Sequence, residues 1–282
     1  MSFGRRGKYF EEFLTPRSAN GIGDFLELNL IPNIDGIYRE DLLEHQGIKP
    51  KPTEVQGVLL SHAHADHANY IGFLHKDIPV YCGKTCKYIL EAVKEQTMRN
   101  IESEVLDYKK RPVFKKNYRD PPIERTFNTF RTGDKIKIDS LEIEPIHVDH
   151  SVPGAYGFII HTSEGPVIYT GDLRLHGRHS HLTEDFIKKA KEEQPIAMIT
   201  EGTRIDSGRT GESEDKVYNK CKKNLEENKK LSLVDFNFKD VDRFTTFYDI
   251  AKALDRKLVI SFKHACYLER YKKKKKLKSP DS

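Results

Sequence analysis

The sequence contains no run of about 18 consecutive apolar residues, so we expect no transmembrane helix and no membrane partner. Its first six residues, Met-Ser-Phe-Gly-Arg-Arg, are not followed by the apolar segment of a secretory signal. Cysteine is also scarce, and a disulfide framework is not expected from the four that are present: Cys82, Cys86, Cys221 and Cys266. These absences favour a cytoplasmic protein.

Neither sign of charge dominates the sequence strongly. The formal net charge is +5, with 37% hydrophobic and 32% charged residues, which suits a globular protein with a charge-rich surface. The basic excess is compatible with binding to a polyanion but does not argue for it alone. Part of it lies in a lysine run at 272–276. The length of 282 residues allows one large domain, or one domain and part of another.

Metal-binding residue types follow one predicted strand. Residues 55–60 form a short aliphatic and β-branched run, which predicts a buried strand, and four polar residues come directly after it: His62, His64, Asp66 and His67. In an extended chain His62 and His64 point to the same side. A turn at Asp66 would bring the other two side chains close. These groups bind zinc, manganese or iron, so the cluster could hold one metal ion or two adjacent ones. A surface histidine cluster without function is the alternative.

The motif His62-x-His64-x-Asp66-His67 resembles the signature of the metallo-β-lactamase superfamily. This resemblance implies an α/β fold, the αββα sandwich. In that fold the metal site lies at one edge and is built from loops at strand ends.

Two later motifs extend the resemblance to one branch of the superfamily. The sequence His-Ser-Val-Pro that begins at His150 resembles the third metal motif of the β-CASP nucleases and ribonuclease J. The sequence Thr-Gly-Asp that ends at Asp172 resembles the fourth motif, whose aspartate bridges two metals.

The resemblance implies two sets of ligands. One zinc would have three histidine ligands and an open position: His62, His64 and His150. The second metal would have three ligands, of which the aspartate at position 172 bridges both ions: Asp66, His67 and Asp172. Manganese is the alternative metal.

Two further acidic residues match the family more loosely. Glu201 follows a predicted buried-type strand at 195–200 and resembles motif A of the β-CASP group. Asp35 resembles an aspartate that supports the metal loop through hydrogen bonds, although the residues around it differ from the usual small ones. Each has an ordinary alternative, because acidic residues are common at strand ends and in turns.

The remaining patterns predict strands at 25–31, 79–82, 135–138 and 141–146, and a hairpin of 155–161 with 166–170. They predict helices at 37–46, 85–110 and 182–193, the last with Thr183 as N-cap. Beyond about residue 205, helices at 215–228 and 242–254 alternate with strands at 231–236 and 258–262, which indicates a parallel sheet. We therefore expect a metallo-β-lactamase-like domain at 1–205. A partial β-CASP-like α/β segment with a basic tail is expected at 206–282.

The resemblance implies a zinc-dependent hydrolase that cleaves RNA phosphodiester bonds through a metal-bound hydroxide, with DNA as an alternative substrate. Asp66 would orient the hydroxide, and Glu201 would act near the scissile phosphate or through a contact behind the ligands. Three basic residues are candidates for contact with the nucleic-acid backbone: Lys115, Lys116 and Arg119. Endonuclease and exonuclease action are both open. The alternatives are a thioester or lactone hydrolase of the same fold, and a metal-binding paralogue without turnover.

The ligand set of the resemblance is incomplete in this sequence. β-CASP nucleases carry further histidines in the inserted domain, whereas here the single histidine after His181 is His264. We also expect this sequence to lack the returning strands that complete the family's sandwich. We therefore expect weak or no nuclease activity, a second metal site of low affinity, and a tendency to form homo-oligomers or aggregates.

Overall fold

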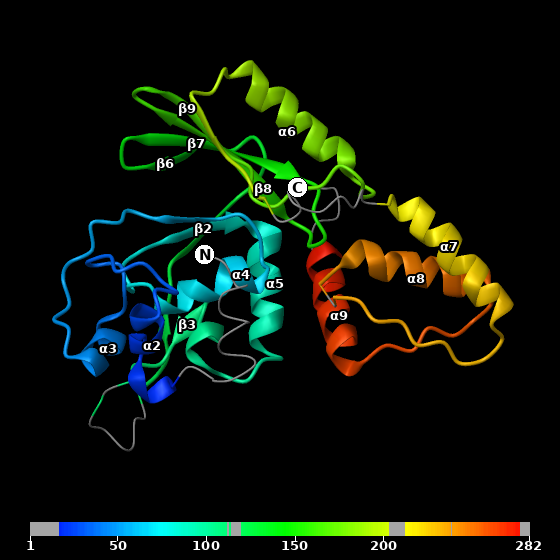
Figure 1. Cartoon of the computed structure of the whole chain (residues 1–282), viewed down its shortest axis with the longest axis horizontal. Helices are drawn as coiled ribbons and strands as arrows, with labels where there is room; N and C mark the ends of the chain where they lie inside the picture. The colour runs from blue at the N-terminus through cyan, green and yellow to red at the C-terminus, as the bar shows by residue number, and fades with distance from the viewer. Residues whose placement is uncertain (1–16, 112, 114–119, 203–211, 238, 277–282) are drawn as a thin grey trace. The chain divides into compact units, whose positions relative to one another are not determined.

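The computed structural model describes residues 17–111, 113, 120–202, 212–237 and 239–276 (Figure 1). The chain divides into two compact units. The first comprises the described parts of Met1–Cys82 and Ile89–Thr129, and the second those of Gly83–Tyr88 and Phe130–Ser282. In the described part of the chain, no helix is both long and apolar enough to cross a membrane.

The first unit opens with short helices. Their bounds are η2 (Ser18–Asn20), α2 (Gly23–Glu27), α3 (Glu40–Leu43), η3 (Glu44–Gln46), α4 (Ala65–Ala68), η4 (Asn69–Phe73) and η5 (Ile101–Ser103). The predicted helix at 37–46 is confirmed by α3 and η3, although it begins three residues later. It ends at Gly47, whose φ of +65° favours glycine.

The predicted strand at 25–31 is wrong, because these residues begin with the helix α2. The buried Phe25 packs beside Phe73 with ring centroids 5.0 Å apart, in a core that also contains Ile22. Ile22 and Phe25 are three residues apart and share one face of a helix, which a strand would separate onto opposite faces. Asn29 then takes a φ of +53°, a conformation that cannot continue a strand.

Two small sheets complete the first unit. The strands β1 (Val58–Leu60) and β2 (Val80–Gly83) are parallel, and β5 (Phe127–Phe130) lies on the other side of β2. A second ladder joins β3 (Asp107–Tyr108) to β4 (Ile123–Glu124). The helix α5 (Lys84–Lys94) has residues in both units and is shorter than the predicted 85–110. The chain leaves the helical conformation because Asn100 is extended and caps η5 instead, accepting a hydrogen bond from Ser103 N.

A buried ionic network holds the segment that follows α4. Arg39 is fully buried and pairs with Asp41 and Glu104 at 2.7 and 2.8 Å. Arg125 donates hydrogen bonds to the carbonyl groups of Gly72 and Leu74, next to η4. Burial, and after it the neighbouring Arg39 cation, lowers the pKa of Arg125 to about 10. The two guanidinium groups thus anchor the chain that follows the histidine cluster.

The second unit contains a five-stranded sheet in the order β10-β9-β8-β7-β6. Its strands are β6 (Ile136–Ile138), β7 (Leu141–Val148), β8 (Ala155–Thr162), β9 (Gly165–Tyr169) and β10 (Ala197–Ile199), of which β10 alone pairs in parallel. The predicted strands at 135–138 and 141–146 and the predicted hairpin are confirmed, because alternating apolar residues and a tight turn encode them locally. The predicted buried character of the last strand is wrong, since all three β10 side chains are exposed.

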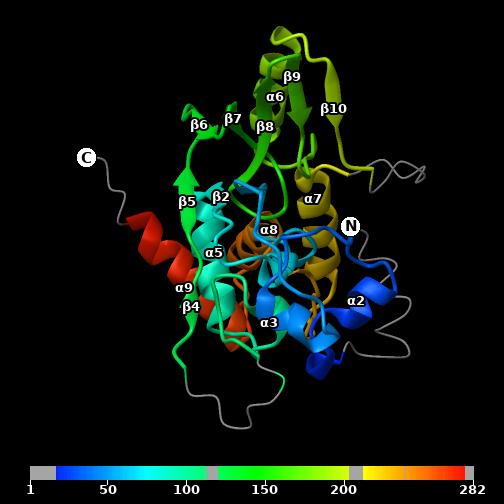
Figure 2. The same ribbon diagram turned by 90° about the vertical axis from the view of Figure 1, so that its left-hand side faces the viewer.

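The helix α6 (Ser180–Glu192) covers one face of this sheet, as Figures 1 and 2 show. Phe186 and Ala190 of α6 pack on Ile146, Val148 and Ile159 in one buried cluster. The helix confirms the one predicted at 182–193. Thr183 is not its N-cap, however, because α6 begins earlier and His179 occupies that position.

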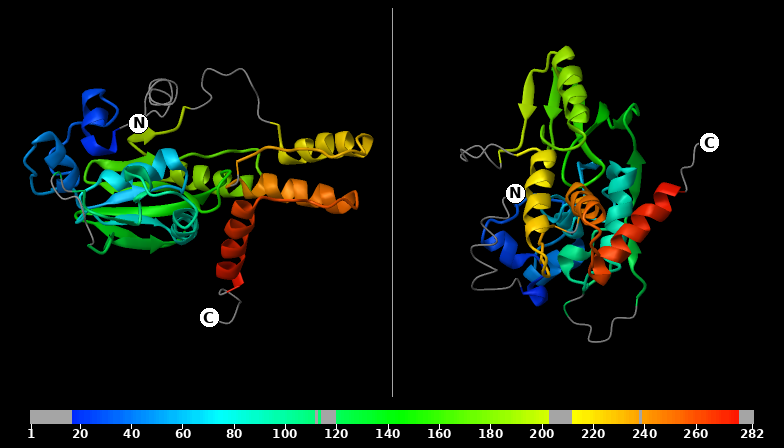
Figure 3. Two further views of the ribbon diagram at one scale, coloured as in Figure 1. Left: turned by 90° about the horizontal axis from the view of Figure 1, so that it is seen from below. Right: turned by 90° about the vertical axis from the view of Figure 1, so that its right-hand side faces the viewer.

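Three helices follow in the second unit: α7 (Glu214–Glu227), α8 (Val241–Ala253) and α9 (Phe262–Lys276). Helices α7 and α8 lie side by side (Figure 3) and confirm the two predicted there. The predicted strands at 231–236 and 258–262 are wrong: in the described residues these segments are not paired with any strand, and Leu231, Leu233 and Val259 are exposed. The predicted parallel sheet is therefore not formed there. The predicted domain boundary at 205 falls in 203–211, outside the described residues, and stays a prediction.

Candidate metal centre

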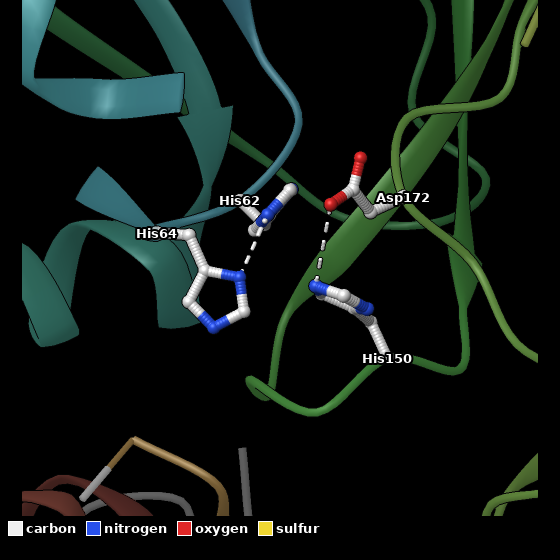
Figure 4. A group of neighbouring side chains, drawn as sticks. All are labelled: His62, His64, His150 and Asp172. Atoms are coloured by element: carbon white, nitrogen blue, oxygen red, sulfur yellow. Dashed lines mark hydrogen bonds and ion pairs between the residues drawn. The ribbon is translucent and has the colours of Figure 1, made fainter. Parts of the chain in front are cut away.

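His62 and His64 lie directly beyond β1 and face each other. His62 Nε2 is 3.1 Å from His64 Nδ1 (Figure 4). The other ring nitrogen of His62 is 3.0 Å from the Ser61 hydroxyl. The chain is still extended at His64, with ψ of 152°, before α4 begins. Residues two apart in extended chain share a side, as the sequence predicts, and the buried Ser61 restricts the rotation of the His62 ring.

Asp66 and His67 belong to α4, one turn further on. The His67 ring lies 4.0 Å from the His62 ring between centroids, and its Nε2 is 3.7 Å from Asp66 Oδ2. The Asp66 side chain is 50% exposed. The turn predicted at Asp66 is the start of this short helix, which directs the carboxylate toward solvent.

His150 and Asp172 come together at the ends of two strands of the larger sheet. His150 follows β7 and Asp172 follows β9, and β8 pairs with both of these strands. His150 Nε2 lies 3.8 Å from Asp172 Oδ2. The antiparallel register of β7, β8 and β9 therefore brings together two residues that are 22 positions apart.

Among the described residues, one group of His, Cys, Asp or Glu side chains could hold a metal ion: His62, His64, His150 and Asp172. Their ligand atoms all lie within 4.8 Å of one another (Figure 4). Three imidazoles and one carboxylate are the donor set that zinc accepts, with bonds of about 2.0–2.2 Å. Small side-chain movements would bring the four atoms onto one ion. Asp66 and His67 are not in this group.

Glu201 and Asp35, which match the family motifs more loosely, lie in different surroundings. Glu201 Oε1 accepts a hydrogen bond of 2.9 Å from the backbone N–H of Leu173, the residue after Asp172. Asp35 is 72% exposed, and its carboxylate pairs with Lys51 at 2.6 Å. Glu201 therefore lies beside a ligand loop, whereas the contacts of Asp35 are those of an exposed turn.

Sequence reasoning missed three residues that hold the His150 and Asp172 loops. Arg174 pairs with the buried Asp149, and the Thr183 hydroxyl accepts a 2.9 Å hydrogen bond from Asp149 N. The available signal for Arg174 was its position two residues after Asp172. No local pattern links Thr183 to Asp149, because they are 34 residues apart.

His147 is a partly buried histidine outside the metal group. Its ring stacks on Tyr156 with centroids 5.2 Å apart, and burial lowers its pKa. The His147 ring thus has a packing role at the end of β7.

The fold and the side-chain group define a class: a mixed α/β protein with a group of histidine and aspartate side chains that could hold a divalent metal ion. A family described as "Beta-lactamase superfamily domain" matches residues 34–191, which is more than half of the chain. The chain therefore belongs to the metallo-β-lactamase superfamily. The predicted family and the predicted α/β fold class are confirmed.

Curated relatives point to one branch of this superfamily. The chain is 27% identical over 159 residues to Ribonuclease J of Pyrococcus abyssi, covering 54% of this chain and 31% of that protein. It is 25% identical over 154 residues to Ribonuclease J of Sinorhizobium meliloti, covering 53% and 23%. The chain thus spans a third or less of the length of these relatives. The expected resemblance to the ribonuclease J branch is confirmed at this modest identity.

One solved structure resembles most of the chain. It is a crystal structure of a protein of unknown function from Enterococcus faecalis V583, with a TM-score of 0.68 and 24% identity. The match covers 93% of this chain and 59% of that chain. This likeness supports the fold alone.

Proposed function

We propose that this protein is a zinc-dependent hydrolase that cleaves phosphodiester bonds in RNA. The observation that carries the proposal is the group of three histidines and one aspartate in a metallo-β-lactamase-family chain. RNA as substrate is taken from the ribonuclease J relatives. The net charge of +5 is compatible with a polyanionic substrate.

The four side chains of the group would hold the ion. A bound divalent cation would lower the pKa of a coordinated water and neutralise charge on the reacting phosphate. Asp66, which is half exposed in α4, would orient the attacking water through its carboxylate. Glu201 fixes the backbone beside Asp172 through Leu173 N. Asp66, His67 and Asp172 remain our proposed ligands for a second ion, and Asp35 our proposed support of the metal loop.

Three further proposals concern the contacts with nucleic acid, the cellular location and the division into domains. The proposed backbone contacts lie outside the described residues: Lys115, Lys116 and Arg119. All four cysteines are free, which is consistent with the proposed cytoplasmic location. We also retain the division into a metallo-β-lactamase-like part at 1–205 and a β-CASP-like part at 206–282 as a proposal.

Metal analysis combined with cleavage of end-labelled RNA and DNA tests the function. We expect zinc in the purified protein together with weak cleavage of RNA, and loss of both the zinc and this weak cleavage in the double variant His64→Ala/His150→Ala. The matched control is His161→Ala, because His161 lies on β8 and outside the metal group. Its zinc content and activity should match the parent protein.

Different results exclude different parts of the proposal. Equal zinc in the parent and the double variant would refute the metal centre. Zinc binding with hydrolysis of a thioester or lactone, but not of RNA or DNA, would refute the nuclease and favour a small-molecule hydrolase.

A further inference from the structure

We propose that Arg174 is a positioning residue that fixes the Asp172 loop against the His150 loop and ties both to α8. The inference rests on the proposed metal centre, because its consequence is the spacing of two proposed ligands. Arg174 is two residues after Asp172, and its main partner, Asp149, immediately precedes His150.

The contacts between the two loops involve both backbone and side chain. Arg174 N donates a 2.9 Å hydrogen bond to Asp149 O. Its Nε and Nη2 donate to Asp149 Oδ1 at 3.3 and 3.2 Å. Three hydrogen bonds between the same two residues fix position and orientation more strongly than one, so the two ligand loops move as a unit.

The Arg174–Asp149 pair is closed to solvent. The side chains are 10% and 2% exposed, and within the described residues Asp149 Oδ2 accepts no hydrogen bond. The backbone of Gly177 packs against the pair so closely that an added Cβ would overlap Asp149 Oδ2 and Arg174 Nε. Because a buried carboxylate needs a compensating charge, Asp149 depends on Arg174.

Arg174 also contacts α8, one of the helices of the second unit. Its Nη2 pairs with the carboxylate of Asp242, in the first turn of α8. That helix is in turn joined to α7, because Arg243 pairs with Glu214 at 2.9 Å. The guanidinium therefore links the metal-ligand loops to α8, and through it to α7.

The direction in which metal affinity changes when Arg174 is removed distinguishes a positioning role from an effect of its charge. A cation beside a metal site opposes binding of a divalent ion, so removal of Arg174 would tighten metal binding if charge were its main effect. A positioning role predicts the opposite, because released ligands must be ordered again when the ion binds. Loss of a contact behind metal ligands typically weakens metal binding by about 10–100-fold.

Zinc affinity, measured by competition with a chromophoric chelator, tests the proposal without RNA. We expect Arg174→Gln to bind zinc at least about tenfold more weakly than the parent protein. Arg174→Lys keeps the charge but not the forked contacts, and its affinity should be intermediate. Spectra of the Co²⁺-loaded variants should report an altered ligand geometry in Arg174→Gln.

Arg178→Gln is the matched control. Arg178 also reaches α8, through Thr246 at 3.2 Å and Asp249 at 3.4 Å, but it has no contact with Asp149 among those the structure records. Its zinc affinity should stay within about twofold of the parent value, a change of less than about 0.5 kcal/mol. If Arg174→Gln does not fold, Arg174→Lys replaces it, because lysine keeps the positive charge beside Asp149 but not the forked contacts. Weaker zinc binding in Arg174→Lys therefore cannot result from a change of charge.

Each outcome has a defined meaning. Unchanged or tighter zinc binding in Arg174→Gln, or in Arg174→Lys where Arg174→Gln does not fold, would overturn the positioning role. An equal loss in Arg178→Gln would also overturn it, because any contact with α8 would then suffice. If His64→Ala/His150→Ala leaves zinc binding intact, the proposed metal centre itself fails, which separates the two failures.

Discussion

Arg39 is a cation with no access to water, and its environment explains why it is tolerated. Asp41 and Glu104 pair with it, and it donates a further hydrogen bond to Gly72 O at 3.1 Å. Its guanidinium carbon also lies 3.7 Å from the centre of the Tyr108 ring. A buried charge costs much free energy unless partners of this kind surround it. The buried ion pairs are therefore stable while all three charged side chains are present. Loss of one side chain leaves its partners buried without a compensating charge.

We predict that Arg39→Met lowers the free energy of unfolding by about 3–5 kcal/mol, because two carboxylates stay buried without their cation. Urea unfolding measures this change. Lys51→Ala is the control, since the Lys51–Asp35 pair is exposed and should contribute only about 0–1 kcal/mol. Similar losses in both variants would contradict the predicted importance of burial.

At the scale of elements, the pair of helices α7 and α8 is stabilised at its helix ends. Ser213 and Asp240 are the N-caps, and their side chains accept hydrogen bonds from Lys216 N and Arg243 N. Between the helices, Glu214 pairs with Arg243 and accepts a hydrogen bond from Thr246. Burial would raise the pKa of Glu214, but the hydrogen bonds and charge of Arg243, together with Thr246, outweigh it and lower the pKa.

This lowered pKa predicts a loss of stability in acid. The folded-state pKa of Glu214 lies below its ordinary value of 4.5, so the unfolded chain binds more protons in that window. Stability from this group is therefore fully present above pH 4.5 and is lost as the pH falls through the folded-state value. We expect Glu214→Gln to be less stable at pH 7 and to lose less stability on acidification.

Unfolding by urea at several pH values between 7 and 3.5 measures the effect. Burial raises the pKa of Asp240, a change of opposite sign. The comparison of Glu214→Gln with the parent isolates Glu214, because Asp240 is present in both. An identical pH dependence in the two proteins would contradict the prediction.

At the scale of the whole molecule, apolar side chains are concentrated at exposed positions late in the chain. Four of them are more than 80% exposed: Leu231, Leu233, Val259 and Phe262. All four belong to the segments that the sequence predicts as strands, and Phe262 also begins α9. Large apolar side chains that are exposed to solvent favour association.

We predict that the protein self-associates as its concentration rises, and that Leu231→Lys/Leu233→Lys weakens this association at least about tenfold, a change of about 1.4 kcal/mol or more. Sedimentation velocity over a range of concentrations measures it. Met98→Lys is the control, because Met98 is equally exposed but lies in the first unit. A parent protein that stays monomeric throughout the range would contradict the prediction.

Local patterns in the sequence were sufficient to predict the family and many of the helices and strands of the second unit. The two-residue spacing of His62 and His64 after a strand is a property of extended backbone, and the structure retains it. The β7–β8–β9 strands were predictable because alternation and short turns depend on neighbouring residues. Helices α6, α7 and α8 were predictable from their periodicity in the same way.

Tertiary structure alone decided the remaining features. Residues 25–31 have a strand-like pattern, yet the packing of Phe25 on Phe73 selects a helix. Residues 231–236 and 258–262 have strand-like composition, but a strand requires a partner, and the sequence pattern does not specify one. The contacts of Arg174 and Thr183 with Asp149 span 25 and 34 residues. Such pairs form only after the sheet has brought the loops together, because no local rule encodes a partner at that separation.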